Sequence, residues 1–204
     1  MSIASNKTEV FGEPVWDIAW LYPAQGQWSK GDYFNLSAET NRLIEFSDGH
    51  IKVLPMPTVS HQRIVAFLYR TLWAFTSIRG LGTVLFAALP MRLREDKYCE
   101  PDILFMLTAN SDRIHEQFWQ GADLVMEVVS EDRRHDMEVK RVEYAEAGIP
   151  EYWIVDPRES KILVLVLEGD TYVVHGEFTT EQIATSRLLP GFAVNVADAI
   201  SAKP

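Results

Sequence analysis

The chain has 204 residues, of which 47% are hydrophobic and 24% are charged, and its formal net charge is −10. This length suits one domain with a hydrophobic core and is short for two. The acidic balance argues against non-specific coating of nucleic acid, because phosphate neutralisation needs clustered Lys and Arg.

The cysteine content and the lengths of the apolar runs indicate the cellular compartment that we expect for the protein. A single cysteine, Cys99, excludes an intramolecular disulfide framework and a cysteine metal cluster, so we expect a reducing, cytoplasmic setting. Cys99 has no basic partner nearby in sequence and is interpreted as a packed residue rather than a nucleophile. The longest apolar run, from Ile162 to Leu167, is too short to span a bilayer. The N-terminus shows no export signal, and we expect no membrane segment.

The first elements in chain order are an aromatic arm and a hairpin. Residues 1–40 carry Trp16, Trp20, Trp28 and other aromatic side chains among turn residues, which predicts an N-terminal arm packed on the core. Residues 41–204 contain no repeat and no Gly/Ser linker, so we expect one domain. At its start LIEF and HIKVLPM flank SDG, a pattern typical of a β-hairpin with its turn at Asp48 and Gly49.

Helices and strands then follow one another. A helix is predicted from Ser60, its expected N-cap, to Gly80, because apolar residues recur at steps of four, four and three. Apolar runs at 83–93, 101–107 and 123–129 predict three strands. A second helix is expected at about 135–147, and EYWIVD, KILVLVL and TYVVHGEF predict further strands. This order indicates an α/β (α+β) protein with a mixed sheet flanked by helices.

Two carboxylates stand out in the strands. Glu127 lies within the apolar run DLVMEVVS, and an unpaired carboxylate in an apolar interior costs several kcal/mol or becomes neutral. Asp102 follows Pro101 at the mouth of the strand ILFML. If the two strands are neighbours, the carboxylates converge, and a divalent cation such as Mg²⁺ or Mn²⁺ would hold them together. Glu127 alone is equally well explained as a salt-bridged sheet residue.

The second predicted helix adds a candidate cation. Asp136, Lys140 and Tyr144 are spaced i, i+4, i+8 and should share one face. Because this helix follows the strand that carries Glu127, its first turns can lean over the strand end, where Lys140 could reach the carboxylates. The simpler interpretation is an exposed Asp136–Lys140 pair.

These residues and the sequence segments around them resemble those of the Uma-type family of restriction endonucleases in the PD-(D/E)XK nuclease superfamily. The resemblance covers nearly the whole chain and runs through YPAQGQWSKGDYFNLSAETNRLIEFSDGHIKVLPMPTVSHQ, EPDILFM, GADLVMEVVSED, DMEVKRVEYAEAGIPEYWIVDP and SRLLPGF. It implies a restriction-endonuclease-like core with a metal-dependent phosphodiesterase site.

The family's pattern implies roles for particular residues. Pro101 and Asp102 match the PD of the motif, and Glu127 matches its acidic residue. The motif's lysine should follow two residues later, where this chain has Val129, and Lys140 fits a lysine moved onto the next helix. A lysine stem is long enough for its ammonium to reach the same place from another element.

The resemblance also implies the ligands of the metal. Asp102 and Glu127, with the backbone carbonyl of Val128, would hold Mg²⁺ or Mn²⁺. Glu45 and His61 match further family positions and are candidates for an extra ligand or a supporting hydrogen bond, as Asp136 and Tyr144 are for ordering Lys140. His61 could instead pack on the hairpin.

The function expected from the resemblance is hydrolysis of phosphodiester bonds in DNA, with DNA as the partner. Val129 at the usual lysine position supports a different class, an inactive nuclease-fold protein that serves as a binding or assembly module. A third class keeps the enzyme and changes the substrate to RNA or another phosphoester. A homodimer is expected from fold analogy alone.

Overall fold

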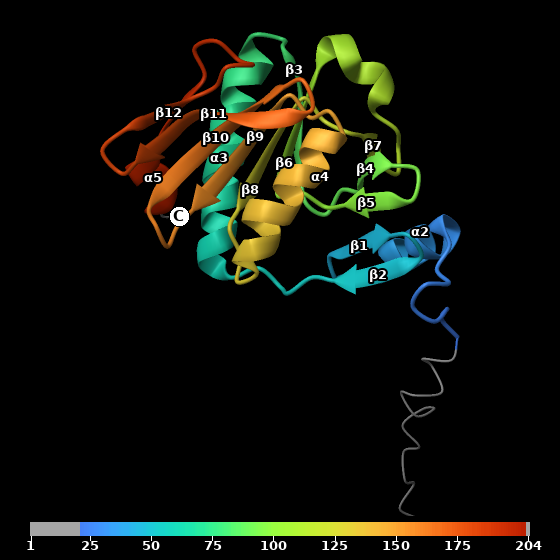
Figure 1. Ribbon diagram of the computed structural model, residues 1–204. Helices are drawn as coiled ribbons and strands as arrows, with labels where there is room; N and C mark the ends of the chain where they lie inside the picture. Colours follow the sequence, from blue (N-terminus) through green and yellow to red (C-terminus); the bar gives the residue numbers. More distant parts are fainter. Residues whose placement is uncertain (1–20, 203–204) are drawn as a thin grey trace, which may run out of the picture.

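A computed structural model describes residues 21–202 of the chain (Figure 1). The helical elements are α2 (Lys30–Glu39), α3 (Val59–Ile78), η1 (Thr108–Arg113), η2 (His135–Val139), α4 (Lys140–Glu146) and α5 (Val196–Ile200). None of the helices within these residues combines the length and the apolarity that crossing a membrane requires.

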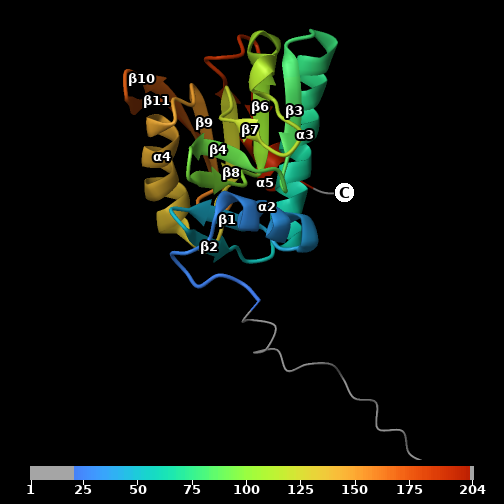
Figure 2. The same ribbon diagram turned by 90° about the vertical axis from the view of Figure 1, so that its right-hand side faces the viewer.

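The central layer is a six-stranded mixed sheet in the order β11-β10-β9-β8-β6-β3. Its strands are β3 (Gly82–Phe86), β6 (Ile103–Leu107), β8 (Leu124–Val128), β9 (Glu151–Asp156), β10 (Lys161–Glu168) and β11 (Thr171–Thr179). Helix α3 covers one face of this sheet and α4 covers the other (Figures 1 and 2). The predicted α/β (α+β) class, a mixed sheet flanked by helices, is confirmed.

The alternation of side chains along the strands builds a core on each face of the sheet. Met126 and Val128 on β8 pack with Leu68 and Leu72 of α3. Val125 and Val129 belong to the cluster on the other face, which includes Tyr144 of α4. Because side chains of a strand alternate with period two, Glu127 falls on the α4 face. The periodicity of β8 alone therefore decides which helix can supply a partner for Glu127.

A smaller five-stranded sheet lies beside the central one, in the order β2-β1-β5-β4-β7. It consists of β1 (Ile44–Ser47), β2 (His50–Val53), β4 (Met91–Arg94), β5 (Lys97–Cys99) and β7 (Trp119–Gln120). Strands β1 and β2 form the predicted hairpin, with positive φ angles of 49° at Asp48 and 79° at Gly49, as a tight two-residue turn requires. A third, two-stranded sheet pairs β12 (Ile183–Thr185) with β13 (Ala193–Asn195).

The structure describes only the second half of the predicted aromatic arm. Trp16 and Trp20 lie outside the described residues, whereas residues 30–39 form helix α2. Ser29 and Asp32 cap this helix reciprocally, which is the local reason it forms. Its buried Tyr33 stacks on Phe46 of the hairpin with ring centroids 5.7 Å apart. The assignment of 1–40 as an arm and 41–204 as one domain stays a prediction.

Two boundaries inside the domain also differ. The N-cap of α3 is Thr58, whose hydroxyl accepts a hydrogen bond from the His61 backbone N–H, and not Ser60. The apolar run at 83–93 is not one strand, because it splits into β3 and β4, which lie in different sheets. The two predicted helices are otherwise confirmed. The first is α3, and the second consists of η2 followed directly by α4.

Candidate functional site

The site begins where two neighbouring strands end. Strands β6 and β8 pair antiparallel with Ile103 opposite Met126, so the next position sets Asp102 beside Glu127. Oδ2 of Asp102 accepts a hydrogen bond from the Val128 backbone N–H at 2.8 Å. The strand pairing thus brings together two carboxylates that are 25 residues apart in sequence, as the sequence predicted.

Glu127 has two partners on α4. Oε1 of Glu127 accepts hydrogen bonds from Lys140 Nζ at 2.9 Å and from Tyr144 Oη at 2.6 Å. The residue is 3% exposed, and this burial, together with repulsion from Asp102 and Asp136, raises the pKa of Glu127 to about 7 in spite of Lys140. Its burial is therefore explained by Lys140 and Tyr144 and is not by itself an argument for a metal.

Lys140 is held among carboxylates. Nζ of Lys140 lies 3.4 Å from Oδ1 of Asp136, besides its contact with Glu127. Burial alone would lower the pKa of Lys140, but Glu127, Glu45 and Asp136 raise it well above its usual value. The side chain therefore stays charged in the interior.

Asp136 is fixed by the loop that precedes it. Its Oδ2 accepts hydrogen bonds from the backbone N–H and the hydroxyl of Ser130, at 2.8 and 2.7 Å. Burial would raise the pKa of Asp136, but Lys140 and these two donors lower it. Asp136 thus links the end of β8 to the beginning of the helix and orders Lys140.

His61 reaches the site from the first turn of α3. Its Nε2 lies 3.2 Å from Oδ2 of Asp102. Burial would lower the pKa of His61, but Asp102, Glu127 and the Val128 carbonyl raise it. Within the described residues Nδ1 of His61 is buried without a hydrogen-bond partner. The histidine therefore borders Asp102 and Val128 rather than only packing on the hairpin.

Glu45 approaches from the hairpin. Its Oε2 lies 3.6 Å from Nε2 of His135, and its Oε1 is buried with no hydrogen-bond partner in residues 21–202. Burial would raise the pKa of Glu45, but His135, Lys140 and Lys52 lower it. His135 is a site residue to which the sequence analysis assigned no role of its own, although it stands shortly before Lys140 in sequence.

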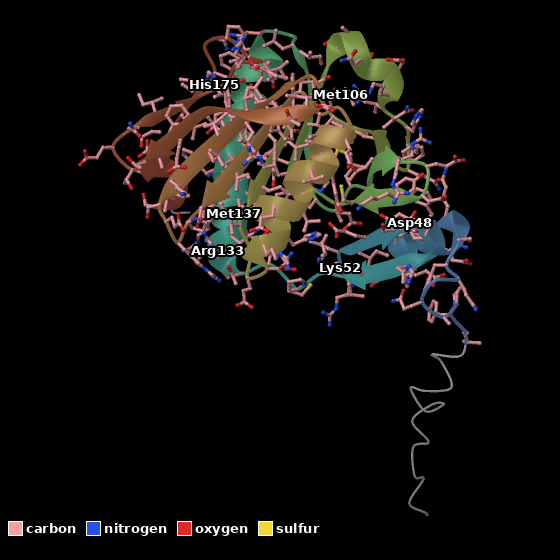
Figure 3. All side chains as sticks on the ribbon, in the orientation of Figure 1. Asp48, Lys52, Met106, Arg133, Met137 and His175 are labelled. Carbon is pink, nitrogen blue, oxygen red and sulfur yellow. The ribbon has the colours of Figure 1, made fainter. Side chains whose placement is uncertain are left out.

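A cavity of about 360 Å³ lies between the hairpin, the start of α3 and the end of β8, and its lining includes Asp102, Glu127, Asp136, Lys140, His61 and His135. Glu45 lines a neighbouring pocket together with His135. Lys52 on β2 lies toward the helix segment that carries Arg133 and Met137 (Figure 3). Nζ of Lys52 is 3.6 Å from Oδ2 of Asp132, so the two segments meet at the edge of the cavity. The floor holds Asp102, Glu127 and Lys140, and one wall is the segment 54–58 between β2 and α3.

The basic cluster that follows Glu127 in sequence does not form a basic groove; it consists of Arg133, Arg134, His135, Lys140 and Arg141. Arg133 pairs with Asp156, Arg134 pairs with Glu138, and Arg141 donates to the Tyr172 carbonyl. Of that cluster only His135 and Lys140 line the cavity. Arg133 and Arg141 hold the helical segment against the strands of the sheet. Arg134 forms an ion pair on the surface.

Comparisons with known proteins point to the same class of protein. A family model described as "Uma2: Putative restriction endonuclease" matches residues 31–197. The chain belongs to this family. Among solved structures, "a putative nuclease belonging to DUF820 from Anabaena variabilis ATCC 29413" is similar, with a TM-score of 0.65 and 15% identity over 82% of this chain and 97% of that one. This likeness shows a shared nuclease-like fold. A search of curated proteins finds no match.

The structure shows what surrounds Val129, the position at which the sequence resemblance would place a lysine. Val129 is 5% exposed and packs in the α4-side cluster. The ammonium next to Glu127 comes from Lys140, one element later. Cys99, nearby, is also buried, and burial raises the pKa of its thiol, which agrees with a packed residue.

The donor set can be tested for its fit to a divalent cation. Within residues 21–202 the hydrogen bonds of the two carboxylates fall on Oδ2 of Asp102 and Oε1 of Glu127. The same residues contain no group of three or more His, Cys, Asp or Glu side chains arranged to hold a metal. Magnesium commonly uses one or two carboxylates with waters and substrate phosphate, so two carboxylates and the Val128 carbonyl fit such a site.

Proposed function

We propose that the protein is a metal-dependent endonuclease that hydrolyses phosphodiester bonds in DNA. The observation that carries the proposal is the floor of the cavity, where Asp102, directly before β6, and Glu127, on the paired strand β8, lie beside the buried ammonium of Lys140. Membership of the Uma2 family and the nuclease-like fold support this class of reaction. The substrate and the metal are part of the proposal.

Asp102, Glu127 and the Val128 carbonyl would hold Mg²⁺ or Mn²⁺. When bound, such an ion lowers the pKa of a coordinated water and offsets the charge of a phosphate. The chain's own residues supply the positioning. The Val128 N–H fixes Asp102, and Lys140 and Tyr144 fix Glu127, which leaves the opposite carboxylate oxygens available.

Hydrolysis consumes one water. A bond forms between the water oxygen and phosphorus, the bond from phosphorus to the leaving ester oxygen breaks, and the leaving oxygen ends with a proton from the water. Lys140 would stabilise the negative charge that builds on the phosphoryl oxygens. Asp136, through its contact with Nζ, would hold that ammonium in place.

The direct test is cleavage of supercoiled plasmid and of single-stranded DNA by purified protein with Mg²⁺, Mn²⁺ or EDTA. We expect metal-dependent cutting that Glu127→Gln and Asp102→Asn abolish. The matched control is Glu177→Gln, because Glu177 is an exposed residue on β11, outside the residues that line the cavity. Equal cutting by Glu127→Gln and the parent, or cutting that EDTA leaves unchanged, would refute the proposal.

An inactive binding module is the second candidate, and Val129 favours it, because no cation follows Glu127 at the usual spacing. RNA or another phosphoester as the substrate is the third. Absence of DNA cutting with either metal, from a folded preparation, would favour these two. The cytoplasmic setting and the homodimer stay predictions.

A further inference from the structure

The depth of the cavity restricts what its floor can touch. Glu127 and Lys140 are 3% and 6% exposed, and the Asp102 side chain is 14% exposed. A phosphodiester must therefore enter the recess to reach them. The cavity, at about 360 Å³, is near the lower end for a pocket that encloses one small ligand. It has room for a single nucleotide rather than for the side of a double helix.

One wall of this recess is apolar and stiff. Leu54, Pro55, Met56 and Pro57 connect the hairpin to α3 and line the cavity. The two prolines fix their own φ angles and favour an extended backbone. Met56 is 60% exposed although a methionine is normally buried. An exposed apolar wall beside the Lys140 ammonium and the proposed metal ligands suits a ligand with a flat apolar face next to a phosphate, which describes a nucleotide.

The charges around the recess disfavour a long duplex. The lining side chains include five carboxylates and three Lys or Arg cations, which are Asp102, Glu127, Glu131, Asp132, Asp136, Lys52, Lys140 and Arg158. Duplex DNA presents one phosphate about every 1.7 Å along its axis, and binding it needs many cations. Glu131 and Asp132 are exposed at the edge of the cavity, and their charges would repel the phosphates of a duplex that came near them.

We infer that the cavity takes one unpaired nucleotide of single-stranded DNA. Its base lies against Met56 and the flanking prolines, and its phosphate faces Asp102, Glu127 and Lys140. The inference rests on the proposed nuclease function and names the substrate form of that site. Arg158 is exposed and lines the same cavity, where it is placed to meet the next phosphate of the strand.

The test compares a fluorescein-labelled single-stranded DNA oligonucleotide with a blunt hairpin duplex that contains the same strand. Binding is measured with Ca²⁺ by fluorescence anisotropy, and cleavage is measured with Mg²⁺ and Mn²⁺. We expect binding of the single strand to be at least about tenfold tighter and cleavage to occur in the single strand or in an unpaired flap. Met56→Ala should weaken single-strand binding about fivefold, since it removes the surface that the base contacts.

The matched control is Ile78→Ala, which removes an exposed apolar side chain at the far end of α3. Both residues are exposed, so both variants should fold. Binding or cutting of the blunt duplex at least as strong as that of the single strand, or equal weakening by Met56→Ala and Ile78→Ala, overturns the inference. If the duplex is cut and Glu127→Gln abolishes that cutting, the inference fails and the nuclease proposal stands.

Binding without cleavage is a third outcome, and it separates the inference from the nuclease proposal. Preferred single-strand binding that Met56→Ala weakens, without cleavage under any metal, supports the inference about the ligand and refutes hydrolysis. Neither binding nor cleavage of either DNA overturns both.

Discussion

Replacing Lys140 by methionine tests how much the charge of Lys140 stabilises the folded protein. Methionine keeps much of the length and apolar volume of the lysine stem and removes its charge. In the folded parent, Nζ of Lys140 lies 2.9 Å from Oε1 of Glu127 and 3.4 Å from Oδ1 of Asp136. The substitution therefore leaves two buried carboxylates without the cation between them.

Removing one partner of a buried ion pair typically costs about 3–5 kcal/mol in the free energy of unfolding, because the other charge stays buried and unpaired. The loss should depend on pH. Because the pKa of Lys140 is raised, its contribution to the free energy of unfolding is fully present at about pH 8, which lies below the usual pKa of a lysine. In the variant Glu127 loses the cation that opposed its raised pKa, and protonation at about pH 5.5 removes the unpaired charge. We therefore expect the loss to be smaller at acidic pH.

Urea unfolding followed by circular dichroism at the two pH values measures this effect. The matched control is Lys161→Met, because Lys161 pairs with Glu159 and Glu177, whose side chains are half exposed, and such pairs contribute about 0–1 kcal/mol. Adding Glu127→Gln to Lys140→Met should restore part of the stability at pH 8. A loss in Lys140→Met no larger than in Lys161→Met, or one of equal size at both pH values, would refute the reasoning.

Three further predictions concern the same region. Burial raises the pKa of Glu100 to about 7, so the folded parent should become less stable as pH rises from about 4.5 to about 7, because its folded state holds a proton that the unfolded chain releases. Glu100→Gln should remove the contribution of Glu100 to this dependence, while that of Glu127 remains, and should gain up to about 3 kcal/mol above neutral pH; parallel stability-against-pH curves for variant and parent would contradict this. Tyr144→Phe removes a hydrogen bond to the Glu127 carboxylate and should lower the free energy of unfolding by about 1.5–3 kcal/mol, as measured by urea unfolding. An unchanged urea midpoint, with the same dependence of the free energy on urea concentration, would contradict this. Mg²⁺ should raise the thermal unfolding temperature of the parent and not that of Asp102→Asn; equal shifts in both would remove Asp102 from the proposed ligands.

Local patterns determined much of the fold. The four-residue apolar spacing after residue 60 gave the helix its buried face, and Asp48 and Gly49 specified the turn of the hairpin. Alternation along residues 124–128 placed Glu127 on one face of its strand. These features depend on neighbours within a few residues, so a single sequence contains them.

The N-terminal region contains a local helix signal among its aromatic residues. Residues 30–39 carry the reciprocal cap of Ser29 and Asp32, a signal that the sequence does contain and that predicts a helix. The run at 83–93 gave no comparable signal. Its division between two sheets depends on which distant strands pair with each half, namely β6 with β3 and β5 with β4.

The sequence by itself determined that a carboxylate stands in an apolar strand and that a lysine follows on the next helix. Only the tertiary structure decided what surrounds them: His61 beside Asp102, His135 beside Glu45, and the apolar wall at 54–57. The physical reason is that these contacts join segments that strand register and helix packing bring together. No periodicity within one segment encodes the distance to another, and that distance decides whether a charged side chain is paired, buried or left facing a cavity.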